Sequence, residues 1–421
     1  MNKNNIIGAV LMAAVFIGYS IYSQPSAEEE AATARQDSIE NVARKNAENA
    51  AKLAAQQKIA QAQAAAEADT TALFHSALKG KATNVVLKNN SVELTLNTKG
   101  GVVSKAVIKN FTDYNGNSNV TLFDSSSQSL NFALAAKEVN INTADLYFTP
   151  SNQTDSTVTM TATAGDGKEL VINYVLGSDY MLHAKLQTVG MANDFAPSAS
   201  QMDVQWKEMC RQQERGFTFE NRYASLTYHK VDGGTDYLSE AKSITDENIE
   251  KKIDWVAFKN QFFSAVMIAK NNFAENSLMT SVPQEKGSGN LKQYEAKMKT
   301  FFDPSGKTPS EFDFYFGPND FRLLKRVEAE STFGKDLEMQ RLVYLGWPLF
   351  RIINRWFTIY VFDFLTGLNI NMGIVLILIT MLLKFITYPM VKKSYMSSAK
   401  MRVLKPKLEE ATKHLNKPED Q

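Results

Sequence analysis

A run of twenty mostly apolar residues, from Met372 to Val391, constrains this chain more than any other feature. A helix of this length can cross the roughly 30 Å hydrocarbon core of a bilayer. Basic side chains follow it directly, so the positive-inside rule predicts that the residues after Val391 lie in the cytoplasm. These cations are Lys392, Lys393, Lys400, Arg402, Lys405 and Lys407.

A second apolar run lies near the N-terminus and carries no charge between Ile6 and Tyr22. Lys3 precedes it and three glutamates, residues 28–30, follow it. This asymmetry predicts an N-terminal transmembrane anchor over residues 1–25, with its N-terminus in the cytoplasm. A cleaved signal peptide is the alternative, although no convincing cleavage site closes the run. Under both interpretations the next segment is exported.

Residues 26–79 form an Ala, Glu and Gln-rich segment with few large apolar side chains. Such a sequence favours helix but has little to bury, so it predicts a solvated, partly helical linker. The whole sequence has 46 basic and 45 acidic residues. This balance gives no support for general binding of nucleic acids, which requires a basic face.

From residue 80 to residue 335 the hydrophobic pattern has period two. Val92, Leu94 and Leu96 share one face of a strand, and residues 157–163, 170–176 and 181–189 repeat such patterns. Turn signals separate these runs at Gly100-Gly101, Asp166-Gly167 and Asp232-Gly233-Gly234. Many short strands over this length predict a large, all-β periplasmic sandwich. Helical periodicity returns only around residues 319–337.

Motifs for catalysis or metal binding are missing from this sequence. Its histidines, at positions 75, 183, 229 and 414, have no metal-ligand spacing. Cys210 lies near Lys207 and Arg211, which could lower the pKa of its thiol, but a structural thiol is favoured because no histidine is near. Glu220, Arg222 and Tyr228 could bind a ligand or form a surface network. We predict a binding or scaffolding module that is not an enzyme and has no cofactor.

Residues 336–368 are expected to contain an amphipathic helix that lies in the membrane interface. Between Trp347 and Phe364, polar side chains recur with helical spacing and aromatic side chains gather opposite them. The polar face consists of Arg351, Asn354, Arg355 and Thr358. A helix packed on the soluble domain is the alternative interpretation.

Lys384 is the one charge within the second predicted transmembrane helix, residues 369–391. Thr380 and Thr387, at i−4 and i+3, share its face. A charge inside a span usually marks a substrate pathway, although a long lysine can instead reach the headgroups by snorkelling. The polar stripe favours a hydrophilic groove. Pro389 is expected to kink or end this helix.

Residues 392–421 are expected to begin a cytoplasmic helical hairpin. Met401, Leu404, Leu408 and Leu415 recur with helical spacing, and basic residues lie between them.

Several segments resemble the YidC/Oxa/Alb insertase family, in its bacterial form with a periplasmic domain. The run Ser397 to Leu408, which contains A-K-M-R-x-L-x-P-K, is similar to the first cytoplasmic helix of that family. Asn371 to Pro389 is similar to its second transmembrane segment. Trp255 to Phe263 and Tyr315 to Pro318 are similar to its periplasmic domain.

This resemblance implies a membrane protein insertase or chaperone of the bacterial inner membrane, with no catalytic residues. Five spans would surround a hydrophilic groove whose positive residue, usually Arg, corresponds to Lys384. Nascent membrane proteins and lipids would be partners, and the Sec translocon and ribosome further ones. Four of the five core spans are not present, so we expect an N-terminal fragment. A membrane-tethered periplasmic binding or scaffold protein is the alternative function.

Overall fold

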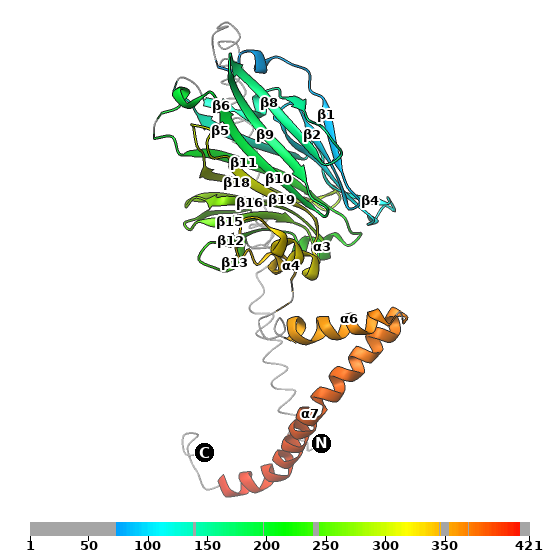
Figure 1. The fold of residues 1–421 in the computed structure, drawn as a ribbon. Helices are drawn as coiled ribbons and strands as arrows, with labels where there is room; N and C mark the ends of the chain where they lie inside the picture. The colour runs from blue at the N-terminus through cyan, green and yellow to red at the C-terminus, as the bar shows by residue number, and fades with distance from the viewer. Residues whose placement is uncertain are drawn as a thin grey trace. The chain divides into compact units, whose positions relative to one another are not determined.

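The computed structural model describes residues 73–412, with gaps at 138–139, 197, 239–243, 345, 347–352 and 369 (Figure 1). The predicted N-terminal anchor and the linker up to residue 72 lie outside the described residues. The described chain divides into two compact units. A β-rich unit comprises residues 73–319 and 323–339, and a helical unit comprises residues 320–322 and 340–412.

A small antiparallel sheet of four strands opens the β-rich unit, in the order β1-β2-β3-β4. Its strands are β1 (Asn84–Lys88), β2 (Val92–Asn97), β3 (Val102–Lys109) and β4 (Asn119–Phe123). The alternation predicted for β2 is confirmed, because Val92, Leu94 and Leu96 are all buried. Gly100 and Gly101 have positive φ angles and form the turn into β3.

The large sheet has fifteen strands, and every described pairing in it is antiparallel. Its main path is β6-β5-β11-β18-β16-β19-β10-β9-β8-β7. Two branches leave this path: β15, β12 and β13 follow one another from β16, and β17 and β14 follow one another from β18. The strands are β5 (Gln128–Ala135), β6 (Asn140–Asn142), β7 (Thr149–Ser151), β8 (Thr157–Gly165), β9 (Lys168–Leu176), β10 (Met181–Val189), β11 (Gln201–Arg211), β12 (Ser225–Lys230), β13 (Thr235–Tyr237), β14 (Thr245–Ile249), β15 (Ile253–Lys259), β16 (Phe263–Phe273), β17 (Ser277–Pro283), β18 (Asn290–Phe301) and β19 (Ser310–Pro318). The predicted large all-β domain is therefore confirmed.

One hydrophobic core joins the two sheets. Phe123 of the small sheet meets Phe316 of the large sheet edge to face, with ring centroids 5.5 Å apart. The buried Tyr174 hydroxyl donates a hydrogen bond of 2.9 Å to the carbonyl of Gly101. Phe74 is also buried in this core, so the packing of the β-rich unit begins before its first strand.

Short helices connect the strands. They are the 3-10 helices η1 (Ser76–Leu78), η2 (Thr143–Asp145) and η3 (Ala192–Asp194) and the α-helices α3 (Phe217–Tyr223) and α4 (Phe321–Glu330). The prediction of helix as far as Leu337 is wrong. The chain leaves the helical conformation after Glu330, and Gly334 has a φ of 64°. Residues 335–339 instead bind the large sheet.

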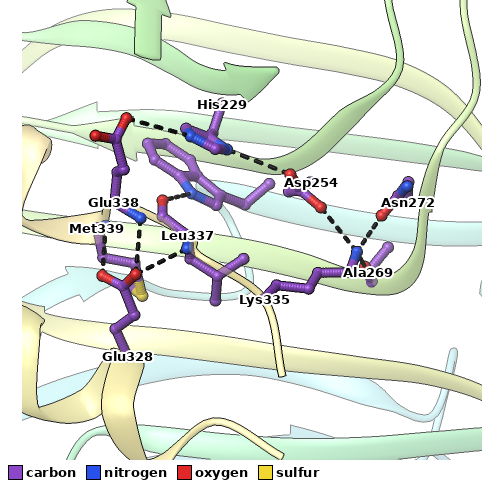
Figure 2. Close-up of polar contacts among 10 residues, drawn as sticks. His229, Asp254, Ala269, Asn272, Glu328, Lys335, Leu337, Glu338 and Met339 are labelled. Carbon is purple, nitrogen blue, oxygen red and sulfur yellow. Dashed lines mark hydrogen bonds and ion pairs between the residues drawn. The ribbon is translucent and has the colours of Figure 1, made fainter. Parts of the chain in front are cut away.

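Glu328 of α4 binds residues 337–339 from one side (Figure 2). Its carboxylate accepts hydrogen bonds from the backbone N–H groups of Leu337, Glu338 and Met339, at 2.8, 2.9 and 3.1 Å. Three backbone donors that would otherwise be unpaired near the core are thereby satisfied. Glu328 thus folds residues 337–339 back against its own helix.

The sheet holds the same segment from the other side (Figure 2). The buried Trp255 Nε1 donates to the carbonyl of Leu337 at 2.7 Å. Lys335 Nζ lies 2.8 Å from Asp254 Oδ1, and His229 Nδ1 lies 3.3 Å from Asp254 Oδ2. Burial alone would raise the pKa of Asp254, but hydrogen bonds from His229 and Lys335 hold it below its ordinary value. We call residues 335–339 and these partners the clamp.

The helical unit contains η4 (Met339–Leu342), a π-helical turn η5 (Asn354–Thr358), α6 (Ile359–Gly367) and α7 (Met372–Thr412). Helix is therefore present in part of the range 336–368, as η5 and α6, while residues 347–352 lie outside the described residues. Of the two effects predicted for Pro389, a kink or the end of the helix, the second does not occur. Pro389 lies within α7, which continues as one helix into the basic segment.

The clamp predicts a difference between two fragments of the β-rich unit. Both residues 73–339 and residues 73–330 should give strand-dominated circular dichroism. The shorter fragment should unfold at a lower urea concentration, because Trp255 and Asp254 lose buried partners. We expect its free energy of unfolding to be lower by roughly 2–4 kcal/mol. Equal unfolding free energies would show that the clamp does not stabilise the sheet, and a helix-dominated spectrum would contradict the fold.

Candidate functional site

Within the described residues, one helix is long and apolar enough to cross a membrane, and it lies in α7. Asn371 caps its start, since its side-chain oxygen accepts a hydrogen bond of 2.8 Å from the N–H of Gly373. Large apolar side chains such as Phe385 and Met390 are exposed along it. An apolar surface of this extent requires lipid or protein to cover it.

Thr380, Lys384 and Thr387, the predicted groove residues, lie along one face of α7. Thr380 Oγ1 donates to the carbonyl of Leu376 at 2.8 Å, and Thr387 Oγ1 donates to that of Leu383 at 2.8 Å. The helix therefore satisfies both threonine hydroxyls itself, as it does for threonines in apolar surroundings. The ammonium group of Lys384 is therefore the group on this face that requires a polar environment, and its side chain is exposed.

The predicted basic residues continue along the same helix. Lys392, Lys393, Lys400, Arg402 and Lys405 have exposed side chains on α7, and Lys407 also falls within its bounds. A row of cations at one end of an apolar helix is the pattern that fixes orientation in a bilayer.

Cys210 is buried on β11, in the interior of the β-rich unit. Burial raises the pKa of its thiol well above the ordinary value, and the carboxyl groups of Glu208 and Glu220 raise it further. The expectation that Lys207 and Arg211 could lower this pKa is wrong. Both are an odd number of residues from Cys210, so they lie on the opposite face of the strand.

Glu220, Arg222 and Tyr228 do not form a common binding site. Glu220 is buried on α3 and accepts hydrogen bonds from the N–H groups of Gln213 and Glu214, each at 3.0 Å. Tyr228 is buried on β12, and its hydroxyl donates to Glu247 at 3.1 Å. Arg222 is exposed on α3. These contacts are structural.

Sequence reasoning missed several buried charged groups in the β-rich unit. Glu208 and Lys292 point into the core, and Lys292 Nζ donates to the carbonyl of Ala224 at 2.8 Å. Lys259 Nζ donates to the carbonyl of Tyr223 at 3.1 Å. Two lysines thus hold the end of α3 onto the sheet. Glu208 was detectable, since it occupies an inward position of the alternating strand Met202 to Cys210.

A polar pocket of about 550 Å³ opens between the loops around Asp113, Ser126, Gln212 and Gly289. Several of its polar groups are already hydrogen-bonded, to one another or to adjacent residues. Asp113 accepts hydrogen bonds from Asn115 and Asn117, and Gln212 donates to the carbonyl of Glu214. Among the described residues no group of acidic, histidine or cysteine side chains could hold a metal ion. The pocket therefore has little unused bonding capacity.

Glu220 predicts how the stability of the β-rich unit depends on pH. Burial raises its pKa to about 7, despite the backbone hydrogen bonds that favour the charged form. The pKa of Glu220 is higher in the folded state than in the unfolded state, so its protonated form stabilises the fold. This contribution to the free energy of unfolding is complete below about pH 4.5 and is lost as pH rises through 7. In urea titrations of fragment 73–339, the free energy of unfolding should therefore fall between pH 5 and pH 8. Glu220→Gln should make this fall smaller by about 2 kcal/mol.

Glu285→Gln, at an exposed position, is the matched control and should leave the pH dependence unchanged. His183 contributes in the same direction as Glu220, because its hydrogen bond to Asp313 raises the histidine pKa. An identical pH dependence for Glu220→Gln and the unmodified fragment would contradict the assignment to Glu220.

Comparison with known proteins relates most of the chain to one family. The YidC periplasmic domain family matches residues 84–360. A membrane protein insertase YidC of Phocaeicola vulgatus is 47% identical over the whole chain, which spans 67% of that relative. A Bacteroides fragilis protein of the same name is 42% identical, with the same coverage. A solved galactose mutarotase-like protein from Lactobacillus casei matches 56% of the chain over its own full length, at 10% sequence identity. The TM-score of this match is 0.36, which is too low to support an argument.

Proposed function

The chain belongs to the YidC family of membrane protein insertases, and we propose that it assists the insertion, folding and assembly of nascent membrane proteins. The observation that carries this proposal is the similarity to proteins named insertases over the whole chain, α7 included.

We propose a topology with two spans in this part of the protein. Residues 1–25 anchor the chain with its N-terminus in the cytoplasm, the linker leads to the periplasmic β-rich domain of residues 80–335, and residues 369–391 return to the cytoplasm. Residues 336–368 lie in the interface, and residues 392–421 begin the cytoplasmic hairpin. Lys3 and the cations after Val391 support this orientation. The location is then the bacterial inner membrane.

Lys384 is proposed to supply the positive charge of the hydrophilic groove. Its ammonium group lies on an apolar helix whose neighbouring threonine hydroxyls are already bonded, so it is the group on this face that demands water or an anionic partner. At an effective dielectric constant near 20, two unit charges 4 Å apart attract by about 4 kcal/mol, before desolvation. This attraction would draw acidic or polar client segments into the groove. The Sec translocon and the ribosome are proposed as further partners.

Substitutions of Lys384 in the full-length protein test this role. Lys384→Arg should retain insertion, because it keeps the charge and adds a planar donor fork. Lys384→Ala should lower insertion, most for clients with an acidic translocated segment, and Lys384→Glu should lower it further by repulsion. The measurement is the insertion efficiency of one acidic client at matched protein levels.

Thr387→Val separates the charge from the neighbouring hydroxyl, because it removes a hydroxyl that bonds within the helix in the described structure. It should lower insertion less than Lys384→Ala does. If Lys384→Ala inserts the acidic client as well as the unmodified protein does, snorkelling explains Lys384 and the groove role is wrong.

Protease accessibility tests the proposed topology. In intact spheroplasts, external protease should cleave the β-rich domain, whereas a tag placed after Val391 should be protected until the inner membrane is lysed. A β-rich domain protected in intact spheroplasts would contradict the orientation.

A further inference from the structure

Two phenylalanines are exposed in the described part of the β-rich unit, although this residue type otherwise fills its core. Phe219 on α3 is 55% exposed, and Phe262 in the turn between β15 and β16 is 46% exposed. An exposed phenylalanine loses its hydrophobic burial energy, so an exposed pair suggests that another apolar phase covers it.

The segments that carry these two side chains meet at one end of the unit. Lys259, just before the turn, donates to the carbonyl of Tyr223 at the end of α3. Asn319, just before α4, donates its backbone N–H to the carbonyl of Phe262 at 2.6 Å. We call α3, the turn 260–262 and residues 323–326 of α4 the aromatic end.

Both aromatic side chains are held outward by defined contacts. The Asn260 side-chain oxygen accepts hydrogen bonds from the N–H groups of Phe262 and Phe263, at 3.0 and 2.7 Å. The ring of Phe263 then turns inward onto Phe111, with centroids 5.3 Å apart. Phe219 packs edge to face on Tyr223 at 5.4 Å. The outward positions therefore follow from the local fold.

Exposed cations lie on the helices of this end and in the adjoining loop. They are Arg215 and Arg222 on or beside α3, and Lys325 and Arg326 on α4, while Asp179, Glu214, Glu220 and Glu328 are acidic residues on or beside the same helices. Arg326 uses one of its donors on Asp179 at 3.1 Å. Aromatic side chains next to cations are typical of surfaces that contact the headgroup region of a bilayer.

The connection along the chain favours lipid over a protein partner. From α4 the chain passes through the clamp to Met339, and Met372 begins the candidate span 33 residues later. A tethered domain meets the membrane at high effective concentration, so a small contact suffices. Two separate phenylalanine rings are too small for a stable protein interface, which buries more than about 1,000 Å².

We propose that the aromatic end docks on the anionic surface of the bilayer, with Phe219 and Phe262 inserted among the headgroups and Arg222 and Lys325 near lipid phosphates. This docking goes beyond the insertase function and does not involve Lys384. Each cation near an anionic surface should favour the docked state by about fivefold.

A fluorescent label on single cysteines tests this contact in the full chain reconstituted into vesicles. Cys210 is the sequence's one cysteine and is buried, so Cys210→Ser provides the background. Phe219→Cys and Phe262→Cys place the label at the aromatic end, and Leu278→Cys places it on an exposed apolar position of β17. Vesicles contain acyl-brominated quencher lipid, with or without phosphatidylglycerol.

Labels at positions 219 and 262 should be quenched in phosphatidylglycerol vesicles, while the label at 278 should not. Adding Arg222→Glu and Lys325→Glu should reduce the quenching at both positions. Quenching no greater than at position 278 would overturn the proposal, and so would shielding of the labels from a water-soluble quencher without quenching by lipid, which would indicate a protein partner. Circular dichroism checks the fold of each variant, and none of these readouts depends on insertion activity.

Discussion

The binding of residues 335–339 to the large sheet and to α4 is the constraint on which the end of the β-rich unit depends. Glu328 takes up three backbone donors of this stretch, while Trp255 and Asp254 bond it to the large sheet. Moving the segment would leave several buried polar groups without partners at once. The exit of the chain toward its membrane segment is therefore fixed by polar contacts as well as by apolar packing.

Period-two patterns predicted strands such as β2, β8 and β10, because each of these has one face in the core. They give no such signal for β15, which is buried on both faces. β10 matches its predicted range, Met181 to Val189, in full, and β8 and β9 differ by at most two residues at an end. The clamp could not be predicted in this way. It joins Lys335 to Asp254, 81 residues apart, and apolar residues up to Leu337 imitate the continuation of a helix. Gly334 was the local signal against that helix.

In the candidate site too, some features could be predicted from the sequence and others required the structure. The prediction of Lys384 and the basic residues after it rests on composition and charge order, which depend only on position along a helix. The contribution of Thr380 and Thr387 required the backbone, since a threonine that bonds to its own helix presents little polarity outward. Cys210 needed the strand direction, because its sequence neighbours Lys207 and Arg211 lie on the other face.

The buried position of Cys210 has a consequence for how the folded protein withstands an oxidising compartment. A thiol with a raised pKa and no solvent access forms little thiolate, and thiolate is the species that attacks disulfides. The folded β-rich unit thus offers no point of attack for thiol–disulfide exchange. Disulfides of other proteins therefore find no accessible thiolate to exchange with while this unit is folded.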